Sequence, residues 1–232
     1  MLRYAAIRHA LIATVLCTAL TGCLSPAASI ALALIPDGTF STLLGNMQGV
    51  EDSNRKQLAE LAAQNDWAGI ARFAEQNIAI DPTNADWWMV AGYAHTQLKQ
   101  YPRANQAFAE AVRLSPDNMD AWNMLGQSYR ALGQPERAIR TFDNALRVSR
   151  ESPMTYFLLG ESFRDLKRPD RAVAYYEQAA QRDPQFTEAW YALGQTYWRL
   201  DRRHDYEQVI EVLRKLDAQA ANQLATLDVS SK

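Results

Sequence analysis

The amino-acid sequence predicts an all-α protein built as a solenoid of antiparallel helix pairs. The main observation is a period of 34 residues along most of the 232-residue chain, at which small and aromatic residues return to the same offsets. A second observation is the placement of proline. Pro135 and Pro169 stand one period apart, where the second helix of a pair would begin. Together these features predict helical hairpins that bury their apolar faces against neighbouring hairpins.

Three copies of the pattern are clear. Each has an aromatic residue and a glycine on its first helix, followed by alanine, an aromatic residue and alanine on its second. In residues 85–118 these are Trp88, Gly92, Ala104, Phe108 and Ala111. In residues 119–152 they are Trp122, Gly126, Ala138, Phe142 and Ala145, and in residues 153–186 they are Tyr156, Gly160, Ala172, Tyr176 and Ala179.

The residue types suit these positions for physical reasons. Two helices approach closely only where side chains are small, so Gly126 and Ala138 mark the expected contact inside one pair. Ala145 would leave room for the next pair to stack. Ser152 before Pro153 predicts an N-cap followed by the first helical position.

The pattern resembles the signature of the tetratricopeptide repeat family, with tryptophan, leucine-glycine and tyrosine on a first helix and alanine, phenylalanine, alanine and proline on a second. This resemblance implies a right-handed superhelical solenoid over residues 51–220, of about five repeats with degenerate ends. The expected repeats are 51–84 (degenerate), 85–118, 119–152, 153–186 and 187–220 (half-degenerate). Residues 221–232 form a C-terminal tail, and the stretch 216–227 is a candidate for a closing helix.

The first residues have the order of a secretory signal peptide. Arg3 and Arg8 precede an uncharged stretch at 10–20, which is shorter than the roughly 20 apolar residues of a membrane span. It leads into Leu-Thr-Gly-Cys, which resembles the bacterial lipobox, with Cys23 as the lipidated residue. We therefore expect a lipoprotein signal peptide at 1–22. The alternative is an ordinary secretory signal with an incidental cysteine.

By the same resemblance, Cys23 would carry several acyl chains of the palmitate type, which hold a protein stably on a membrane. No aspartate follows Cys23, and this favours the outer membrane, with the protein facing the periplasm. Residues 23–50 then form an anchor and an apolar N-terminal segment. Its apolar run at 27–35 is read either as a helix packed on the first repeat or as a segment that touches the membrane or a partner.

Composition and motifs exclude several function classes. The chain has a formal charge of −2 and no basic stripe, so we expect no nucleic-acid partner. It has no phosphate-binding loop, no nucleophile motif and no histidine pair at metal-ligand spacing. We expect no catalytic residue, no metal site and no cofactor other than the lipid on Cys23. Cys17 lies in the predicted signal peptide, so no disulfide is expected.

The family resemblance also implies a concave groove, lined by the first helix of each repeat. Carried onto this sequence residue by residue, the predicted partner-binding residues are Met89, Tyr93, Asn123, Gln127, Arg130, Phe157, Glu161, Arg164, Tyr191, Gln195 and Trp198. The four aromatic members, Tyr93, Phe157, Tyr191 and Trp198, lie outside the packing signature. They are therefore expected to be exposed anchors for a ligand.

Two questions about this groove remain open: whether the protein itself fills it, and which partners its two arginines have. It could be filled by the protein's own N-terminal segment or C-terminal tail. Arg130 and Arg164 share one repeat position and would form a ridge for acidic ligands, or would pair with nearby acids such as Glu161 and Asp165.

The sequence favours a binding protein over an enzyme. The leading interpretation is a lipid-anchored, periplasm-facing adaptor or scaffold that binds protein or peptide partners in envelope or outer-membrane complex assembly. The second is a structural lipoprotein that associates with itself as a homo-oligomer and has an occluded groove.

Overall fold

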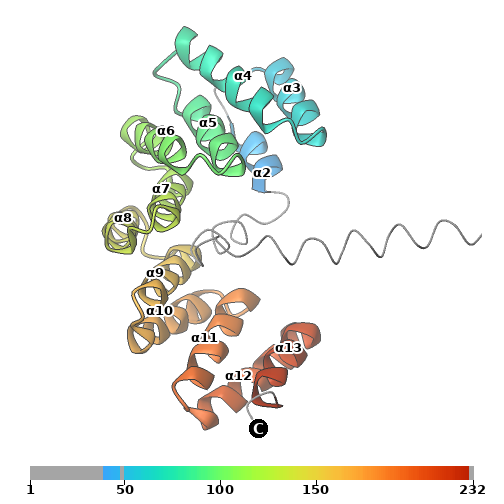
Figure 1. Ribbon diagram of the computed structural model, residues 1–232, viewed down its shortest axis with the longest axis vertical. Coiled ribbons are helices and arrows are strands. Elements are labelled where there is room, and N and C mark those ends of the chain that lie inside the picture. Colours follow the sequence, from blue (N-terminus) through green and yellow to red (C-terminus); the bar gives the residue numbers. More distant parts are fainter. Residues whose placement is uncertain (1–38, 48–49, 230–232) are drawn as a thin grey trace, which may run out of the picture.

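The computed structural model describes residues 39–47 and 50–229, and within them every regular element is a helix. The helices form an open arc, with α3 and α4 at one end and α12 and α13 at the other (Figure 1). Helix α2 lies on the inner side of this arc. The predicted all-α solenoid of helix pairs is therefore confirmed.

The helix bounds follow the repeat. The described helices are α2 (Thr39–Asn46), α3 (Asp52–Ala63), α4 (Trp67–Ile80), α5 (Ala85–Gln97), α6 (Tyr101–Leu114), α7 (Met119–Ala131), α8 (Pro135–Val148), α9 (Pro153–Asp165), α10 (Pro169–Arg182), α11 (Thr187–Arg199), α12 (Arg203–Leu216) and α13 (Ala218–Val229).

Helix starts are encoded as expected. Helices α8 and α10 begin at Pro135 and Pro169, where the missing N–H would have no partner in the helix anyway. Before α9, the Ser152 side chain accepts a hydrogen bond from the Thr155 backbone N–H at 3.2 Å, and Pro153 follows as the first helical residue. The predicted cap and both proline positions are therefore confirmed.

The turn inside each helix pair places one residue in the left-handed region. These residues stand one period apart: Asn65, Lys99, Gly133, Lys167 and Asp201, with φ between 55° and 69°. At the third turn, the Gly133 N–H bonds to the Arg130 carbonyl and the Gln134 N–H bonds to the Tyr129 carbonyl, both at 2.9 Å. This is a Schellman ending, which satisfies carbonyls at the end of the first helix. Glycine occupies only one of the five turns.

The signature glycines lie against aromatic rings of the second helix. A Cβ added to Gly126 would sit 2.2 Å from Cε1 of Phe142, and one added to Gly160 would sit 2.5 Å from Cε1 of Tyr176. Ala138 is fully buried as expected, but the group that occupies the space at Gly126 is the Phe142 ring. The aromatic residue of the signature therefore explains the glycine.

In the last repeat, a residue of a different helix fills the space beside the signature glycine. Its second helix has Ile210 at the position of the aromatic ring, and Leu224 of α13 fills the space beside Gly194. The Tyr206 hydroxyl, moreover, donates a hydrogen bond of 2.8 Å to the Leu224 carbonyl. Helix α13 thus completes the core of a repeat that lacks one large side chain.

Tryptophan at the fourth position of a repeat ties the first helices α5, α7 and α11 to the turn before them. The indole N–H groups of Trp88, Trp122 and Trp190 donate to the backbone carbonyls of Pro82, Pro116 and Pro184, at 3.0, 2.8 and 3.1 Å. Each bond spans six residues and lies at the junction of two successive pairs. These bonds fix how one hairpin follows another.

The described part of the predicted 23–50 segment is helix α2 and its flanks. Phe40, Leu44 and Met47 are buried, and they belong to one apolar cluster with residues of α3, α4 and α5. The signal peptide, Cys23 and the apolar run at 27–35 lie outside the described residues. Among those that are described, no helix is long and apolar enough to cross a membrane.

Candidate functional site

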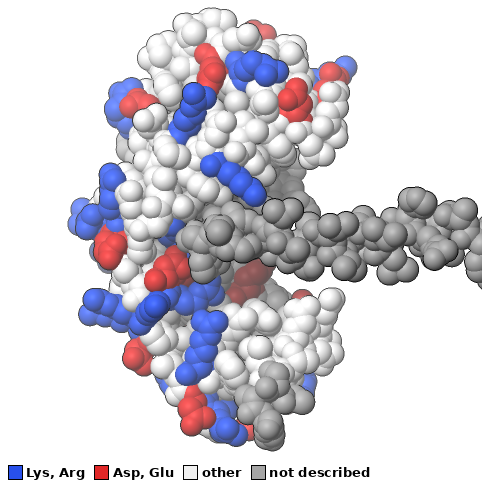
Figure 2. All heavy atoms as spheres, viewed as in Figure 1, with Lys and Arg blue, Asp and Glu red and all other residues white. Residues whose placement is uncertain are grey.

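The candidate site is the hollow side of the arc, which Figure 2 shows between its two ends. The first helices α5, α7, α9 and α11 supply the predicted groove residues. From the N-terminal end to the C-terminal end, this surface has four parts that differ in burial and chemistry.

At the N-terminal end, helix α2 covers the predicted groove residue Tyr93. The Phe40 ring lies 5.0 Å from the ring of Tyr93 and 5.5 Å from that of Trp67, measured between centroids. Such aromatic contacts are typical of a packed core. Tyr93 keeps only 5% of its surface exposed, so the prediction that it is an exposed anchor is wrong, because α2 occupies this part of the groove.

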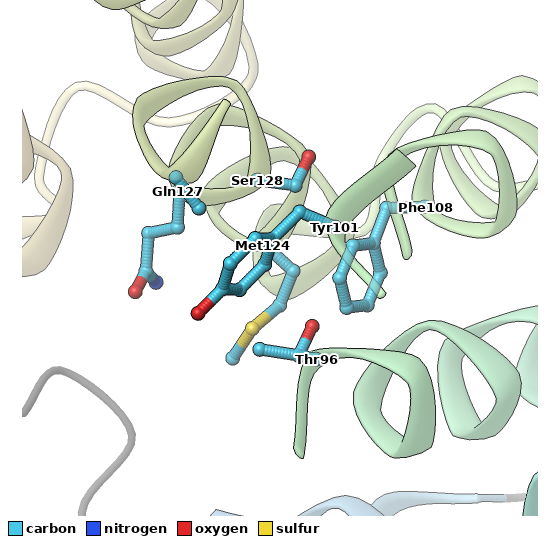
Figure 3. A pocket seen from close by; sticks show the side chains of 7 residues that line it. Thr96, Tyr101, Phe108, Met124, Gln127 and Ser128 are labelled. Atoms are coloured by element: carbon cyan, nitrogen blue, oxygen red, sulfur yellow. The ribbon is translucent and has the colours of Figure 1, made fainter. Parts of the chain in front are cut away.

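The next part is a small pocket between α5, α6 and α7, shown in Figure 3. Thr96, Tyr101, Met124 and the predicted groove residue Gln127 surround it, with a volume of about 20 Å³. The Tyr101 hydroxyl is buried and has no hydrogen-bond partner in the described part of the chain, and burial raises its pKa. A neutral donor therefore faces a space beside the Gln127 amide.

An ionic cluster follows, between α7 and α9. The Arg130 guanidinium donates to Asp165 at 2.8 Å and to Glu161 at 3.2 Å, and Arg164 also pairs with Glu161. The side chains of Arg130 and Glu161 are only 4% and 3% exposed. Of the two interpretations of Arg130 and Arg164, the structure favours pairing, because the two nearby carboxylates neutralise both guanidinium groups.

Tyr176 extends this cluster into the core. Its hydroxyl donates to Glu161 at 2.6 Å, and burial, together with the Glu161 charge, holds the pKa of Tyr176 well above its usual range. Glu161 thus receives hydrogen bonds from three side chains of the protein. Such a fully paired carboxylate is a structural element of the repeat interface.

Two further predicted groove residues bridge repeats. Asn123 accepts a hydrogen bond of 2.9 Å from the Thr155 hydroxyl, which lies one repeat further along. The Phe157 ring packs between Tyr176 and Phe186, with centroids 5.8 and 5.2 Å away, and it is 6% exposed. The prediction that Phe157 is exposed is therefore also wrong, because neighbouring aromatic rings enclose it.

The C-terminal part is the more open one. Tyr191, Gln195 and Trp198 on α11 are half-buried, so each keeps surface that a ligand could reach. Gln127 and Arg164 are half-buried as well, whereas Met89 is buried in the cluster that α7 completes. The accessible predicted residues are therefore Gln127, Arg164, Tyr191, Gln195 and Trp198.

Sequence reasoning missed the residues that fill or shape the groove from outside the first helices. Phe40 comes from α2, and Tyr101 opens the second helix α6. A signal for Phe40 existed, since Phe40, Leu44 and Met47 have the i, i+4, i+7 spacing of an amphipathic helix. The described residues contain no cluster of three metal-ligating side chains.

Comparison with solved structures shows the same architecture. A crystal structure of MamA superposes with a TM-score of 0.60 and 17% identity, covering 78% of this chain and 99% of that one. TTC0263 of Thermus thermophilus, described as a thermophilic TPR protein, superposes with a TM-score of 0.61 and 18% identity, covering 76% of this chain and 98% of that one. YrrB, described as a TPR protein with an unusual peptide-binding site, superposes with a TM-score of 0.57 and 20% identity, covering 81% of this chain and 97% of that one. At these identities the likeness establishes the fold.

Sequence comparison establishes the family. No curated protein sequence matches the chain significantly. One model of the tetratricopeptide repeat matches residues 123–185 and 157–223, and another matches residues 85–128. These matches span residues 85–223, more than half of the 232 residues. The chain therefore belongs to the tetratricopeptide repeat family.

Proposed function

We propose that this protein is a non-catalytic, lipid-anchored adaptor that faces the periplasm and binds protein partners in envelope or outer-membrane complex assembly. Tetratricopeptide repeats are protein-interaction scaffolds, and this supports the adaptor role. The lipobox-like sequence ending at Cys23 supports the anchor. The lack of aspartate after Cys23 supports an outer-membrane location.

The observation that carries the binding role is the Tyr101 hydroxyl in the groove pocket, which has no hydrogen-bond partner among the described residues. A buried hydroxyl without a partner costs about 1 to 3 kcal/mol. A peptide carbonyl placed beside Tyr101 and Gln127 would recover that cost. Half-buried Tyr191 and Trp198 would then provide apolar contact further along the same face.

The occupied N-terminal part limits where such a partner sits. Helix α2 covers Tyr93, and the paired cluster around Arg130 offers no free charge. We therefore assign partner binding to the pocket at Gln127 and to the α11 surface. The ligand would be held by apolar contacts and neutral hydrogen bonds.

Site-specific photocrosslinking in the producing cell tests this assignment. A benzoyl-phenylalanine at Gln127 or at Trp198 should capture the same partner protein. The same group at Arg140, which is exposed on α8, is the matched control and should not capture it. Equal capture at all three positions would contradict a groove site. Adducts between two copies of this chain would favour the alternative, self-association with an occluded groove.

The anchor has a separate test. Cys23→Ser removes the thiol that lipidation requires, so the protein should leave the membrane fraction or remain unprocessed. Fractionation after a carbonate wash measures this. If the variant stays in the membrane fraction as the parent does, the anchor proposal is wrong, whatever the crosslinking shows.

A further inference from the structure

A second pocket lies away from the predicted groove residues. It has a volume of about 280 Å³ and is formed by α10, α11 and α12. None of the predicted groove residues Tyr191, Gln195 and Trp198 lines it, although all three are on α11. The pocket is therefore a feature of the last repeat junction, distinct from the groove.

The last junction has shorter side chains than the preceding one at two positions that line the pocket. Ala180 of α10 lines the pocket, and the residue one period earlier is Leu146. Val209 of α12 also lines it, and its counterpart Tyr175 stacks on Phe163 with centroids 5.1 Å apart. Relative to the preceding junction, both positions therefore have a shorter side chain, although Val209 has about the size of its earlier counterpart Thr141. The other counterparts of Ala180 are also larger: Ile78, Val112 and Arg214.

The charge of the pocket rim is reversed relative to the earlier junctions. Asp205 lines the pocket at the repeat position of Arg137 and Arg171, which lie over the rings of Tyr129 and Phe163 at 4.3 and 5.7 Å. Gln181 is the second change, since the earlier repeats have arginine at its position: Arg113 and Arg147. The last junction has thus exchanged two basic positions for an acidic and a neutral one.

Trp190 lacks the arginine that covers the equivalent ring of the preceding repeat, as do Trp88 and Trp122, which have Leu114 and Val148 at that position. Tyr156 stands one period before Trp190, and the Arg182 guanidinium lies 4.0 Å from its ring centroid and donates to its hydroxyl. The position of Arg182 is Leu216 in the last repeat. The half-buried Trp190 ring, which is the best aromatic acceptor for a cation, lines the pocket without an arginine from its own repeat.

Two carboxylates remain able to accept a ligand. Glu177 receives the Tyr197 hydroxyl on Oε1 at 2.5 Å, and Asp205 receives Arg202 on Oδ2 at 2.7 Å. Each contact uses one oxygen, so the second oxygen of each carboxylate can still accept a donor. Arg202 lies over Tyr197 at 4.4 Å and does not line the pocket. Counted together with Arg202, which pairs with Asp205 from outside the lining, the two carboxylates leave one net negative charge at the pocket.

We propose that this pocket binds an arginine side chain of a protein partner. The aliphatic stem would lie on Leu193 and Val209, the planar guanidinium would face Trp190, and its N–H groups would bond to Glu177 and Asp205. The preceding repeat contains an arginine–aromatic contact of this kind within the chain itself, between Arg182 and Tyr156. The inference does not depend on the groove, because it concerns another surface.

The test uses the full-length chain and heteronuclear NMR. The probe is N-acetyl-arginine N-methylamide, and its citrulline counterpart is a neutral control of nearly the same shape. The arginine probe should give a saturable shift of the Trp190 indole N–H, identified with Trp190→Phe. The citrulline probe should bind at least about fivefold more weakly, because it lacks the charge.

Ala180→Leu is the decisive variant, since it supplies the side chain that Leu146 has at the preceding junction. It should abolish the saturable shift without lowering the unfolding temperature. Asp205→Asn should weaken binding, whereas Asp170→Asn, the same change at an exposed site of α10, should not. The proposal is overturned by an arginine probe that causes no saturable shift, by equal binding of citrulline, or by unchanged binding to Ala180→Leu.

Discussion

Adding one methyl group at Gly126 should destabilise the protein, although alanine favours helices more than glycine does. The new Cβ would lie 2.2 Å from Cε1 and 2.5 Å from Cζ of Phe142, whereas carbon atoms in contact are roughly 3.5 to 4.0 Å apart. The Phe142 ring is fully buried, so it cannot move aside into solvent. Overpacking of this kind costs about 1 to 3 kcal/mol.

The expected net effect combines this cost with helix propensity. Alanine is favoured over glycine by about 1 kcal/mol inside a helix. Because the clash is with a buried ring, we expect the upper end of the overpacking range and a net loss of about 2 kcal/mol. For a chain of this size, the unfolding temperature should fall by about 4 to 8 °C. Thermal unfolding followed by far-UV circular dichroism measures the change.

Two further variants test whether the loss comes from the contact with Phe142. Gly45→Ala in α2 is the matched control, since among the described residues no atom beyond its chain neighbours and its own helix backbone lies within 4 Å of its added Cβ, and it should gain about 0.5 to 1 kcal/mol. Phe142→Leu should recover part of the loss in the Gly126→Ala background, because a smaller side chain leaves room. A clash between the added Cβ and Phe142 is contradicted if Gly126→Ala matches the parent in stability, or if the effects of the two changes are simply additive.

Three further predictions concern other parts of the solenoid. Phe40→Ala should lower the unfolding free energy by about 3 kcal/mol and shift the fluorescence of Trp67, and an unchanged spectrum would argue against α2 docking. Gly133→Ala should cost about 1 to 2 kcal/mol because φ is 69°, whereas Lys167→Gly at the equivalent turn should be neutral or stabilising; urea titration compares them. Tyr176 has a raised pKa in the folded state, so its protonated hydroxyl stabilises the fold fully below the unfolded pKa of 10.0, and this contribution falls as the pH rises above that value. Tyr176→Phe should therefore reduce the loss of unfolding free energy at alkaline pH, which urea unfolding at several pH values measures.

The repeat signature predicted the features that depend on local spacing. The 34-residue period predicts the positions of Gly126 and Phe142 in the signature. Pro135 and Ser152 predict helix starts because each acts on the local backbone. These features could be predicted from the sequence because each one either recurs with the 34-residue period or depends on residues within a single turn of helix. The all-α solenoid follows from them.

The features that the signature did not predict depend on long-range packing. The docking of Phe40 on Tyr93 joins parts of the chain that share no period, so Tyr93 was expected to be exposed. Lys99 and Lys167 adopt positive φ, although neither residue favours it, because the helix ending and the packing of both helices impose the turn. The pairing of Arg130 with Asp165 was one of two alternatives, and only the geometry between repeats decides it.

The contact between α2 and α5 also bears on the order in which the chain folds. Neighbouring helix pairs can form as soon as their own residues are available, since repeat arrays propagate from neighbour to neighbour. Phe40, in contrast, packs on Tyr93, so α2 has no complete docking surface until α4 and α5 have formed. The first described helix of the chain should therefore be among the later ones to become protected from hydrogen exchange during refolding, and its apolar face stays open to other contacts until then.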